Sequence, residues 1–139
     1  MIVKDSVQQE IITHCNELSP NQACGLVLCD KNKVAMCVCR SRNMGSWPYG
    51  FHIDPIDHFN AFKKATANNW EVGGVYHCHI ASKPTPSGRD LERPIPKNML
   101  YIIVSLLNEK NPEIKGYFFQ KKTAKEVNLE TGVEQCLLQ

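Results

Sequence analysis

Residues 75–90 read VYHCHIASKPTPSGRD, a stretch that contains a pair of histidines followed by a serine and an aspartate. It closes an apolar run, Glu71–Ile80, that predicts a β-strand, and it continues into a polar, proline-containing loop. Because side chains alternate between the two faces of a strand, His77 and His79 project to the same side, about 7 Å apart along the backbone. Two imidazoles placed in this way can hold one metal ion through ring nitrogens at about 2.0–2.1 Å.

Asp90 and Ser87 complete a candidate catalytic site. The loop Ala81–Pro86 can fold the carboxylate of Asp90 back towards the two histidines. Two histidines and one carboxylate leave the fourth tetrahedral position of a zinc ion open for water, which is the arrangement of catalytic rather than structural zinc. Zinc lowers the pKa of such a water to about 7 and polarises a scissile carbonyl. Ser87 lies one helical turn before Asp90, where its hydroxyl can donate to a developing oxyanion.

Each half of this pattern also has an ordinary structural interpretation. Ser87 and Asp90 have the spacing of a helix capping box, and a His-x-His pair on a strand often belongs to a solvated face. Short motifs produce many false matches when they are taken singly. The joint spacing of all four residues favours the metal site.

The chain before this stretch predicts two helices separated by a hairpin. The first helix is expected to begin with a capping box of Ser6 and Gln9 and to end at Pro20, and its apolar positions are Val7, Ile11, Cys15 and Leu18. Strands over Ala23–Cys29 and Val34–Arg40 are expected to form the hairpin. A loop over Ser41–Gly50 then leads to the second helix. Asp54 followed by Pro55 is typical of an N-cap with proline at the first helical position. The apolar stripe of this second helix consists of Ile56, Phe59, Phe62 and Ala65.

After the stretch, a short helix is expected over Ser87–Glu92. Met99–Leu107 is almost wholly apolar and predicts a buried central strand. Further strands are expected over Ile114–Gln120, Glu126–Leu129 and Val133–Leu138. No internal repeat or linker is evident, so the sequence predicts one α/β domain over 1–139, in which helices flank a mixed β-sheet.

Composition excludes several classes of protein. A chain of 139 residues, 42% of them hydrophobic, can bury a core without disulfide or metal staples. A formal charge of only +2 argues against a dedicated nucleic-acid binder. No apolar run approaches the roughly 20 residues of a membrane span, and the start MIVKDSVQQE is unlike a secretory signal. Seven cysteines without framework spacing favour a reduced, cytoplasmic location over a disulfide scaffold.

The spacing His-x-His, seven residues, Ser, two residues, Asp resembles the signature of the JAMM metallopeptidases, the catalytically competent MPN domains. The resemblance covers most of the chain, from Pro20 to Phe119. Further stretches similar to blocks of that family occur, in the same order, at Pro20–Leu26, Arg42-Asn43, Phe51–Pro55, Gly73–Tyr76 and Tyr101–Leu106.

The resemblance implies a fold, a cofactor and roles for the site residues. The fold would be the three-layer arrangement similar to cytidine deaminases. His77, His79 and Asp90 would be the Zn²⁺ ligands, and Ser87 would stabilise the transition state. The family's general base is a glutamate in the first block, and the matching position here is Gln22.

Gln22 is the one departure from the family pattern. An amide can orient a metal-bound water through a hydrogen bond, but it cannot take the proton, and loss of general acid-base help typically costs about 10²–10⁴-fold in rate. Glu17 is the nearest alternative carboxylate, but it lies on the preceding helix and is not expected to substitute. Two explanations stay open: Gln22 is native in a substrate-binding pseudoenzyme, or it is an introduced exchange of glutamate. The intact set of other site residues favours the second.

The activity implied by the resemblance is a zinc-dependent isopeptidase or peptidase that cleaves after the C-terminal tail of a ubiquitin-like protein. The chain is similar to stand-alone prokaryotic forms, and among these we favour a bacterial deconjugase or precursor processor, some of which act in antiviral defence. The alternatives are a non-catalytic, zinc-retaining module that binds such a tail, and a phage tail-assembly peptidase. No nucleic acid or membrane is expected as a partner, and the oligomeric state is left open.

The remaining histidines and cysteines have ordinary structural interpretations. Cys78 is expected to point away from the histidines into the core, and Cys24 to be a small core residue. Cys37 and Cys39 are expected to serve packing rather than metal binding. The histidines expected at the surface or as satisfied polar groups are His14, His52 and His58. The aromatic residues that fit either a substrate groove or a small core under a loop are Trp47, Tyr49 and Phe51.

Overall fold

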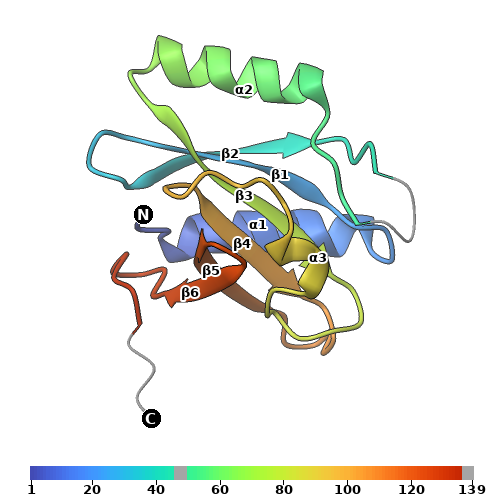
Figure 1. Ribbon diagram of the computed structural model, residues 1–139. Coiled ribbons are helices and arrows are strands. Elements are labelled where there is room, and N and C mark those ends of the chain that lie inside the picture. The colour runs from blue at the N-terminus through green and yellow to red at the C-terminus, as the bar shows by residue number, and fades with distance from the viewer. Residues whose placement is uncertain (46–49, 136–139) are drawn as a thin grey trace.

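The computed structural model describes residues 1–45 and 50–135, and in these ranges the chain forms three helices and six strands (Figure 1). The helices are α1 (Asp5–Leu18), α2 (Pro55–Ala67) and α3 (Gly88–Leu91). The strands are β1 (Cys24–Cys29), β2 (Ala35–Ser41), β3 (Glu71–His79), β4 (Leu100–Ser105), β5 (Glu113–Gln120) and β6 (Thr123–Val127). Within the same ranges, no helix has the length and apolar character that crossing a membrane requires.

The six strands form one mixed sheet in the order β2-β1-β3-β4-β5-β6. β3 and β4 are parallel and lie at its centre, and every other neighbouring pair is antiparallel. β1 and β2 form the predicted hairpin, and the connection from β3 to β4 contains α3. The structure therefore confirms the α/β fold class with a mixed sheet.

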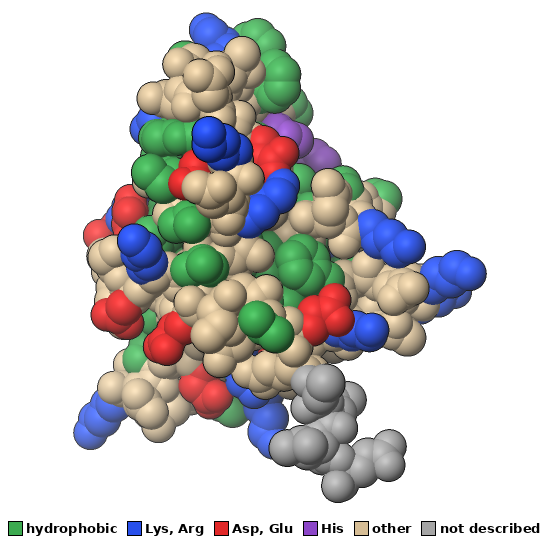
Figure 2. All heavy atoms as spheres, turned by 90° about the vertical axis from the view of Figure 1, so that its left-hand side faces the viewer, with side chains coloured by type: hydrophobic (Ala, Val, Ile, Leu, Met, Phe, Trp, Pro, Cys, Tyr) green, Lys and Arg blue, Asp and Glu red, His purple; other side chains and the backbone are tan. Residues whose placement is uncertain are grey.

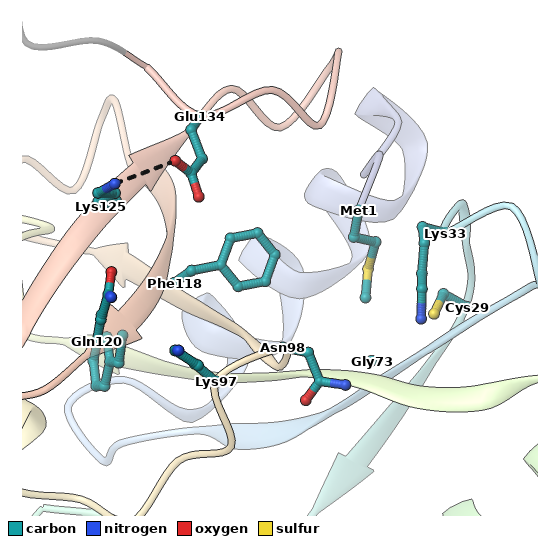
Figure 3. Close-up of a pocket in the computed structure, with 11 residues that line it drawn as sticks. Met1, Cys29, Lys33, Gly73, Lys97, Asn98, Phe118, Gln120, Lys125 and Glu134 are labelled. Carbon is teal, nitrogen blue, oxygen red and sulfur yellow. Dashed lines mark ion pairs between the residues drawn. The ribbon is translucent and has the colours of Figure 1, made fainter.

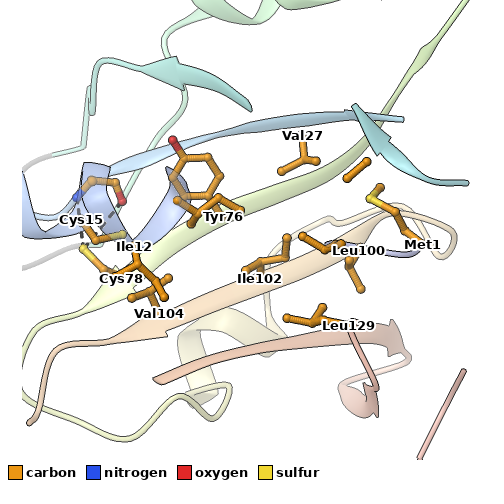
Figure 4. Close-up of a cluster of buried hydrophobic side chains, with 14 of the residues drawn as sticks. Met1, Ile12, Cys15, Val27, Tyr76, Cys78, Leu100, Ile102, Val104 and Leu129 are labelled. Carbon is orange, nitrogen blue, oxygen red and sulfur yellow. Dashed lines mark hydrogen bonds between the residues drawn. The ribbon is translucent and has the colours of Figure 1, made fainter. Parts of the chain in front are cut away.

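The sheet has a hydrophobic core on each face, because successive residues of a strand point to opposite sides. One core joins α1 to the sheet and includes Ile12, Tyr76 and Cys78 (Figure 4). The other includes Ala61 of α2 together with Tyr101 of β4. The helices α1 and α2 therefore cover opposite faces, which gives three layers (Figure 1).

Cys78 shows how this alternation separates the core from the candidate site. Its side chain is fully buried on the α1 face, where the thiol accepts a hydrogen bond of 3.2 Å from the amide of Ala23. The neighbouring residues His77 and His79 consequently face the other side of the sheet. The prediction that Cys78 lies in the core is confirmed.

β4 is buried along its whole length, which confirms the central strand predicted from the apolar run Met99–Leu107. Its parallel register with β3 pairs Val75 with Tyr101 and His77 with Ile103. Tyr101 thus enters the same layer as the histidines, because its partner Val75 lies two residues before His77 on the same face of β3.

The apolar stripe predicted for α2 is mostly on the surface. The exposed fractions of Ile56, Phe59 and Phe62 are 68%, 61% and 58%, whereas Ala61 and Ala65 are buried. The helix approaches the sheet through these two small residues, four apart, so the larger side chains point outward. Figure 2 shows hydrophobic side chains at the top of the molecule, where α2 lies.

Other local predictions differ in detail. α1 begins after Lys4 without a side-chain cap, so Ser6 lies inside the helix and the predicted capping box of Ser6 and Gln9 does not form. By contrast, Asp54 caps α2 as expected, through the amide of Ile56. The strand expected near Glu126–Leu129 is present as β6, which begins three residues earlier and ends two residues earlier.

Some predictions reach beyond the described ranges. Of the strand expected over Val133–Leu138, residues 136–138 lie outside the described residues, and 133–135 contribute an isolated bridge between Glu134 and Val127. The groove residues Trp47 and Tyr49 also lie outside the described residues.

Candidate metal centre

The end of β3 and the helix α3 bring two histidines and one carboxylate together. His77 and His79 are the last two residues of β3 on their face, and Asp90 lies within α3. The Nε2 atom of His77 is 3.2 Å from Oδ1 of Asp90, and Nε2 of His79 is 3.1 Å from Oδ2. One nitrogen or oxygen of each residue lies within 4.8 Å of the others, so the group could hold a metal ion.

Asp90 is fixed by donors on both of its oxygens. Oδ2 accepts hydrogen bonds from the amide and the hydroxyl of Ser87, at 2.8 and 3.0 Å. Oδ1 accepts a hydrogen bond of 2.6 Å from the hydroxyl of Tyr101. Burial alone would raise the pKa of the Asp90 carboxyl, but the hydrogen bonds with His77, His79 and Tyr101 hold that pKa well below its usual range. Asp90 therefore presents a charged, oriented carboxylate to the two histidines.

The two imidazoles are held differently. Burial lowers the pKa of His77, which favours its neutral, ligating form. Burial also acts to lower the pKa of His79, but hydrogen bonds with Asp90 and with the carbonyl of Lys83 outweigh it and raise that pKa. The 2.9 Å contact between Nδ1 of His79 and the Lys83 carbonyl fixes Nδ1 as the donor and leaves Nε2 for a metal.

The donor set fits a divalent transition metal. Two imidazole nitrogens and one carboxylate oxygen are ligands that zinc prefers in sites with an open fourth position. Asp90 supplies the negative charge, and the second nitrogen of His79 already has the backbone acceptor that metal-ligating histidines usually have. The residues present therefore fit the metal that the sequence predicts.

Ser87 anchors Asp90 in this structure. The two residues form a full capping box, in which the Asp90 amide donates to the Ser87 hydroxyl at 3.2 Å while the Ser87 amide and hydroxyl donate to the carboxylate. A hydroxyl has only one proton, and here it is directed at Asp90. To stabilise an oxyanion, Ser87 would have to redirect that proton towards substrate.

Gln22 lies at the edge of a cavity of about 620 Å³ that also reaches His79. Its side-chain oxygen Oε1 is buried and has no hydrogen-bond partner among the described residues. Asn43 supports this segment, because its amide donates to the backbone carbonyl of Gln22 at 3.2 Å. Glu17 instead pairs with Arg40 at 2.7 Å on the surface, as expected for a residue outside the site.

Three residues near the site were not assigned these roles by the sequence. Tyr101 orients Asp90, and Phe51 stacks on His77 with ring centroids 4.4 Å apart. Arg93 packs on the Phe51 ring, with its Cζ atom 3.8 Å from the centroid. Among these three residues, the sequence contained a clue only for Tyr101, because a tyrosine hydroxyl inside an apolar strand requires a hydrogen-bond partner.

The other histidines and cysteines occupy the structural roles expected of them. His14 is buried and contacts the Tyr76 hydroxyl at 2.6 Å, and His52 and His58 are exposed. Cys24 is buried in the core, and Cys37 and Cys39 are half-buried against it. None of these residues belongs to the His77, His79 and Asp90 group.

A second cavity, of about 400 Å³, lies beside Gly73, near the opposite end of β3 (Figure 3). Phe118 lines it, together with lysines from three separate segments. Two of these lysines are already paired, Lys33 with Glu71 and Lys125 with Glu134. The residues that could hold a metal take no part in this cavity.

The sequence of this chain is similar to those of known proteins. A sequence model described as "Prokaryotic homologs of the JAB domain" matches residues 4–120. A desampylase of Pyrococcus furiosus is 36% identical over 101 residues, which cover 73% of this chain and 69% of that protein.

Solved structures share the fold. A protein of Desulfitobacterium hafniense superposes with a TM-score of 0.80 at 27% identity, over 91% of this chain and 89% of that one. A JAB1/MPN domain protein of Archaeoglobus fulgidus superposes with a TM-score of 0.63 at 21% identity, over 94% of this chain and 97% of that one.

Proposed function

The chain belongs to the family of prokaryotic homologs of the JAB domain, and on that premise we propose that it is a zinc-dependent isopeptidase acting at the C-terminal tail of a ubiquitin-like protein. The observation that carries this proposal is the convergence of His77, His79 and Asp90 within 4.8 Å beside a cavity of substrate size. The relative at 36% identity supports it, since the name desampylase denotes removal of a conjugated ubiquitin-like modifier.

In the proposed site, His77, His79 and Asp90 hold the metal. Bound zinc would supply a Lewis acid for the scissile carbonyl and a water with a pKa of about 7. Hydrogen bonds from Tyr101 and Ser87 keep the carboxylate of Asp90 pointed at the histidines. When substrate is present, the Ser87 hydroxyl can turn from Asp90 and donate to the oxygen that develops negative charge.

The cavity beside the site suits an extended, small-residue chain. Four of the residues that line it are small, namely Gly45, Gly50, Ala81 and Ser82. The glycine-rich tail of a ubiquitin-like protein has no bulky side chains near its end, so it can lie between these residues and bring its terminal carbonyl towards His79. Backbone hydrogen bonds would then provide affinity without a specific side-chain pocket.

Gln22 limits the catalytic rate in this proposal. Its unpartnered Oε1 atom can accept a hydrogen bond from the nucleophilic water, but the amide cannot carry the proton to the leaving amine. We therefore expect correct binding and slow turnover. The same residue favours the second candidate function, a non-catalytic module that binds a ubiquitin-like tail and retains its metal.

Restoring a carboxylate at position 22 tests the two candidates. The zinc-loaded parent and the Gln22→Glu variant are incubated with fusions in which ubiquitin-like proteins that end in diglycine precede a reporter. The isopeptidase proposal expects cleavage about 10²–10⁴-fold faster in the variant. Asn21→Asp is the matched control, because it adds the same charge to the same cavity one residue away.

Each outcome has a definite meaning. Cleavage by Gln22→Glu, and not by Gln22→Glu combined with Asp90→Asn, supports the metal-dependent isopeptidase. Tight binding of the tails without cleavage by any variant assigns the binding module instead. Cleavage of a phage tail protein in preference to every ubiquitin-like fusion would replace the proposed substrate class and leave the metal site in place.

A further inference from the structure

His77 lacks a contact that metal-ligating histidines usually have. The ring nitrogen that does not face the metal almost always donates to a carboxylate, a backbone carbonyl or a water, and this fixes the orientation of the ring. His79 follows the rule through the Lys83 carbonyl. The Nδ1 atom of His77 is buried and has no hydrogen-bond partner in the part of the chain that the structure describes. Among the described residues, no hydrogen bond at Nδ1 fixes the plane of this ring, although Nε2 faces Asp90 at 3.2 Å.

An aromatic ring lies against His77. The Phe51 ring stacks on the imidazole, with centroids 4.4 Å apart and planes inclined by only 22°. Phe51 is 4% exposed, so it has little freedom to move. The Tyr101 and His79 rings also contact the imidazole, but at angles of 55° and 71°, so Phe51 alone lies nearly parallel to it among these three.

Arg93 in turn fixes Phe51. Its guanidinium lies 3.8 Å from the Phe51 ring centroid, and its Nη2 atom donates a hydrogen bond of 2.6 Å to the Phe51 carbonyl. Arg93 lies two residues after the end of α3, and its amide donates to the carbonyl of Asp90 at 3.1 Å. Arg93 therefore contacts Asp90 through its backbone and reaches His77 through the Phe51 ring.

We propose that Phe51 and Arg93 are positioning residues for the metal: Arg93 holds Phe51 in place, and the Phe51 ring sets the plane of the His77 imidazole where other ligands use a hydrogen bond. The inference rests on the metal site of the proposed function. It predicts that changes at Phe51 or Arg93, neither of which supplies a ligand atom, alter the affinity and geometry of the bound metal.

Titration of the metal-free chain with Co²⁺ tests the proposal, because cobalt replaces zinc and its visible absorption reports the coordination geometry. Phe51→Leu removes the stacked ring and keeps an apolar side chain. We expect its Co²⁺ affinity to fall about 10–100-fold, the usual effect of losing a group that orients a metal ligand, with a change in the visible bands. Phe118→Leu is the matched control, because it makes the same exchange on the other core of the sheet.

Arg93 provides a second test that does not depend on a buried residue. Arg93 is only half-buried, so Arg93→Met is expected to fold, which circular dichroism and thermal unfolding can verify. Arg93→Met should weaken Co²⁺ binding and shift the bands in the same direction as Phe51→Leu. Arg93→Lys keeps a cation over the ring and should restore part of the affinity.

The results separate this inference from the proposed function. If the unchanged chain binds no Co²⁺, the metal site itself is refuted. If the unchanged chain binds Co²⁺ tightly, and Phe51→Leu and Arg93→Met bind it with the affinity and spectrum of Phe118→Leu, the positioning role alone is overturned. Weaker binding with altered bands in both variants, and not in the control, supports it.

Discussion

The hydroxyl of Tyr101 offers a sharp test of how the candidate centre is held together. It donates to Oδ1 of Asp90 at 2.6 Å, and both residues are buried. Tyr101→Phe removes one oxygen atom and leaves the packed ring in place. Hydrogen bonds to charged groups contribute about 1.5–3 kcal/mol to stability. We therefore expect the metal-free variant to be less stable than the parent by about that amount in urea unfolding at pH 7.5.

Tyr117→Phe is the matched control for this measurement. Tyr117 pairs with Tyr101 across β4 and β5, and its hydroxyl donates to the carbonyl of Pro84 at 2.7 Å. That acceptor is neutral, so the control should lose only about 0.5–1.5 kcal/mol. Co²⁺ affinity should fall more in Tyr101→Phe, where a ligand loses its orienting donor. Equal stability losses and unchanged metal affinity in Tyr101→Phe would refute the role of this hydroxyl.

The same variant has a defined acid response. Asp90 has a folded-state pKa below its unfolded value of about 3.9, so its ionised form stabilises the fold above that pH. This stabilisation is lost as the pH falls from about 3.9 through the folded-state pKa. Tyr101→Phe raises the folded-state pKa of Asp90. The variant, already less stable at neutral pH, should lose less additional stability below pH 3.9 than the parent does.

Two further predictions concern residues away from the centre. Burial lowers the pKa of His14, so the folded state favours the neutral imidazole. The contribution of His14 to folding stability is complete above the unfolded pKa of about 6.5 and declines as the pH falls below that value. His14→Gln should therefore reduce the slope of the urea unfolding midpoint against pH between pH 7 and 5. Phe59→Gln and Phe62→Gln should each change unfolding free energy by less than about 0.5 kcal/mol, because both side chains lie mainly in solvent; a loss of 2 kcal/mol in urea unfolding would show that α2 packs through them.

Much of the fold could be predicted because its signals are local. The apolar run at Met99–Leu107 and the alternation in Glu71–Ile80 predict β4 and β3 to within two residues at either end. The capping box of Ser87 and Asp90 also forms as its three-residue spacing indicates. Each of these features depends on residues that are close in the chain, where backbone geometry alone fixes the relative directions of side chains.

Helix α2 shows where local reasoning was insufficient. Its sequence contains two helical stripes that share Ala65, the expected one through Ile56, Phe59 and Phe62 and a second one through Ala61. Periodicity identifies an amphipathic helix but cannot choose between faces when both are apolar. The close approach of the helix to the sheet decides in favour of the alanines, which are buried while the large side chains remain exposed.

The amino-acid sequence by itself determined the central strands, the His-x-His pair and the short helix that carries Asp90, because spacing along one element fixes which side chains share a face. Only the tertiary structure decided that Tyr101 holds Asp90, that Phe51 stacks on His77 and that Arg93 holds Phe51. These contacts join residues 11, 26 and 42 positions apart. Their distances depend on the β3–β4 register and on the path of the loops, which no local pattern specifies.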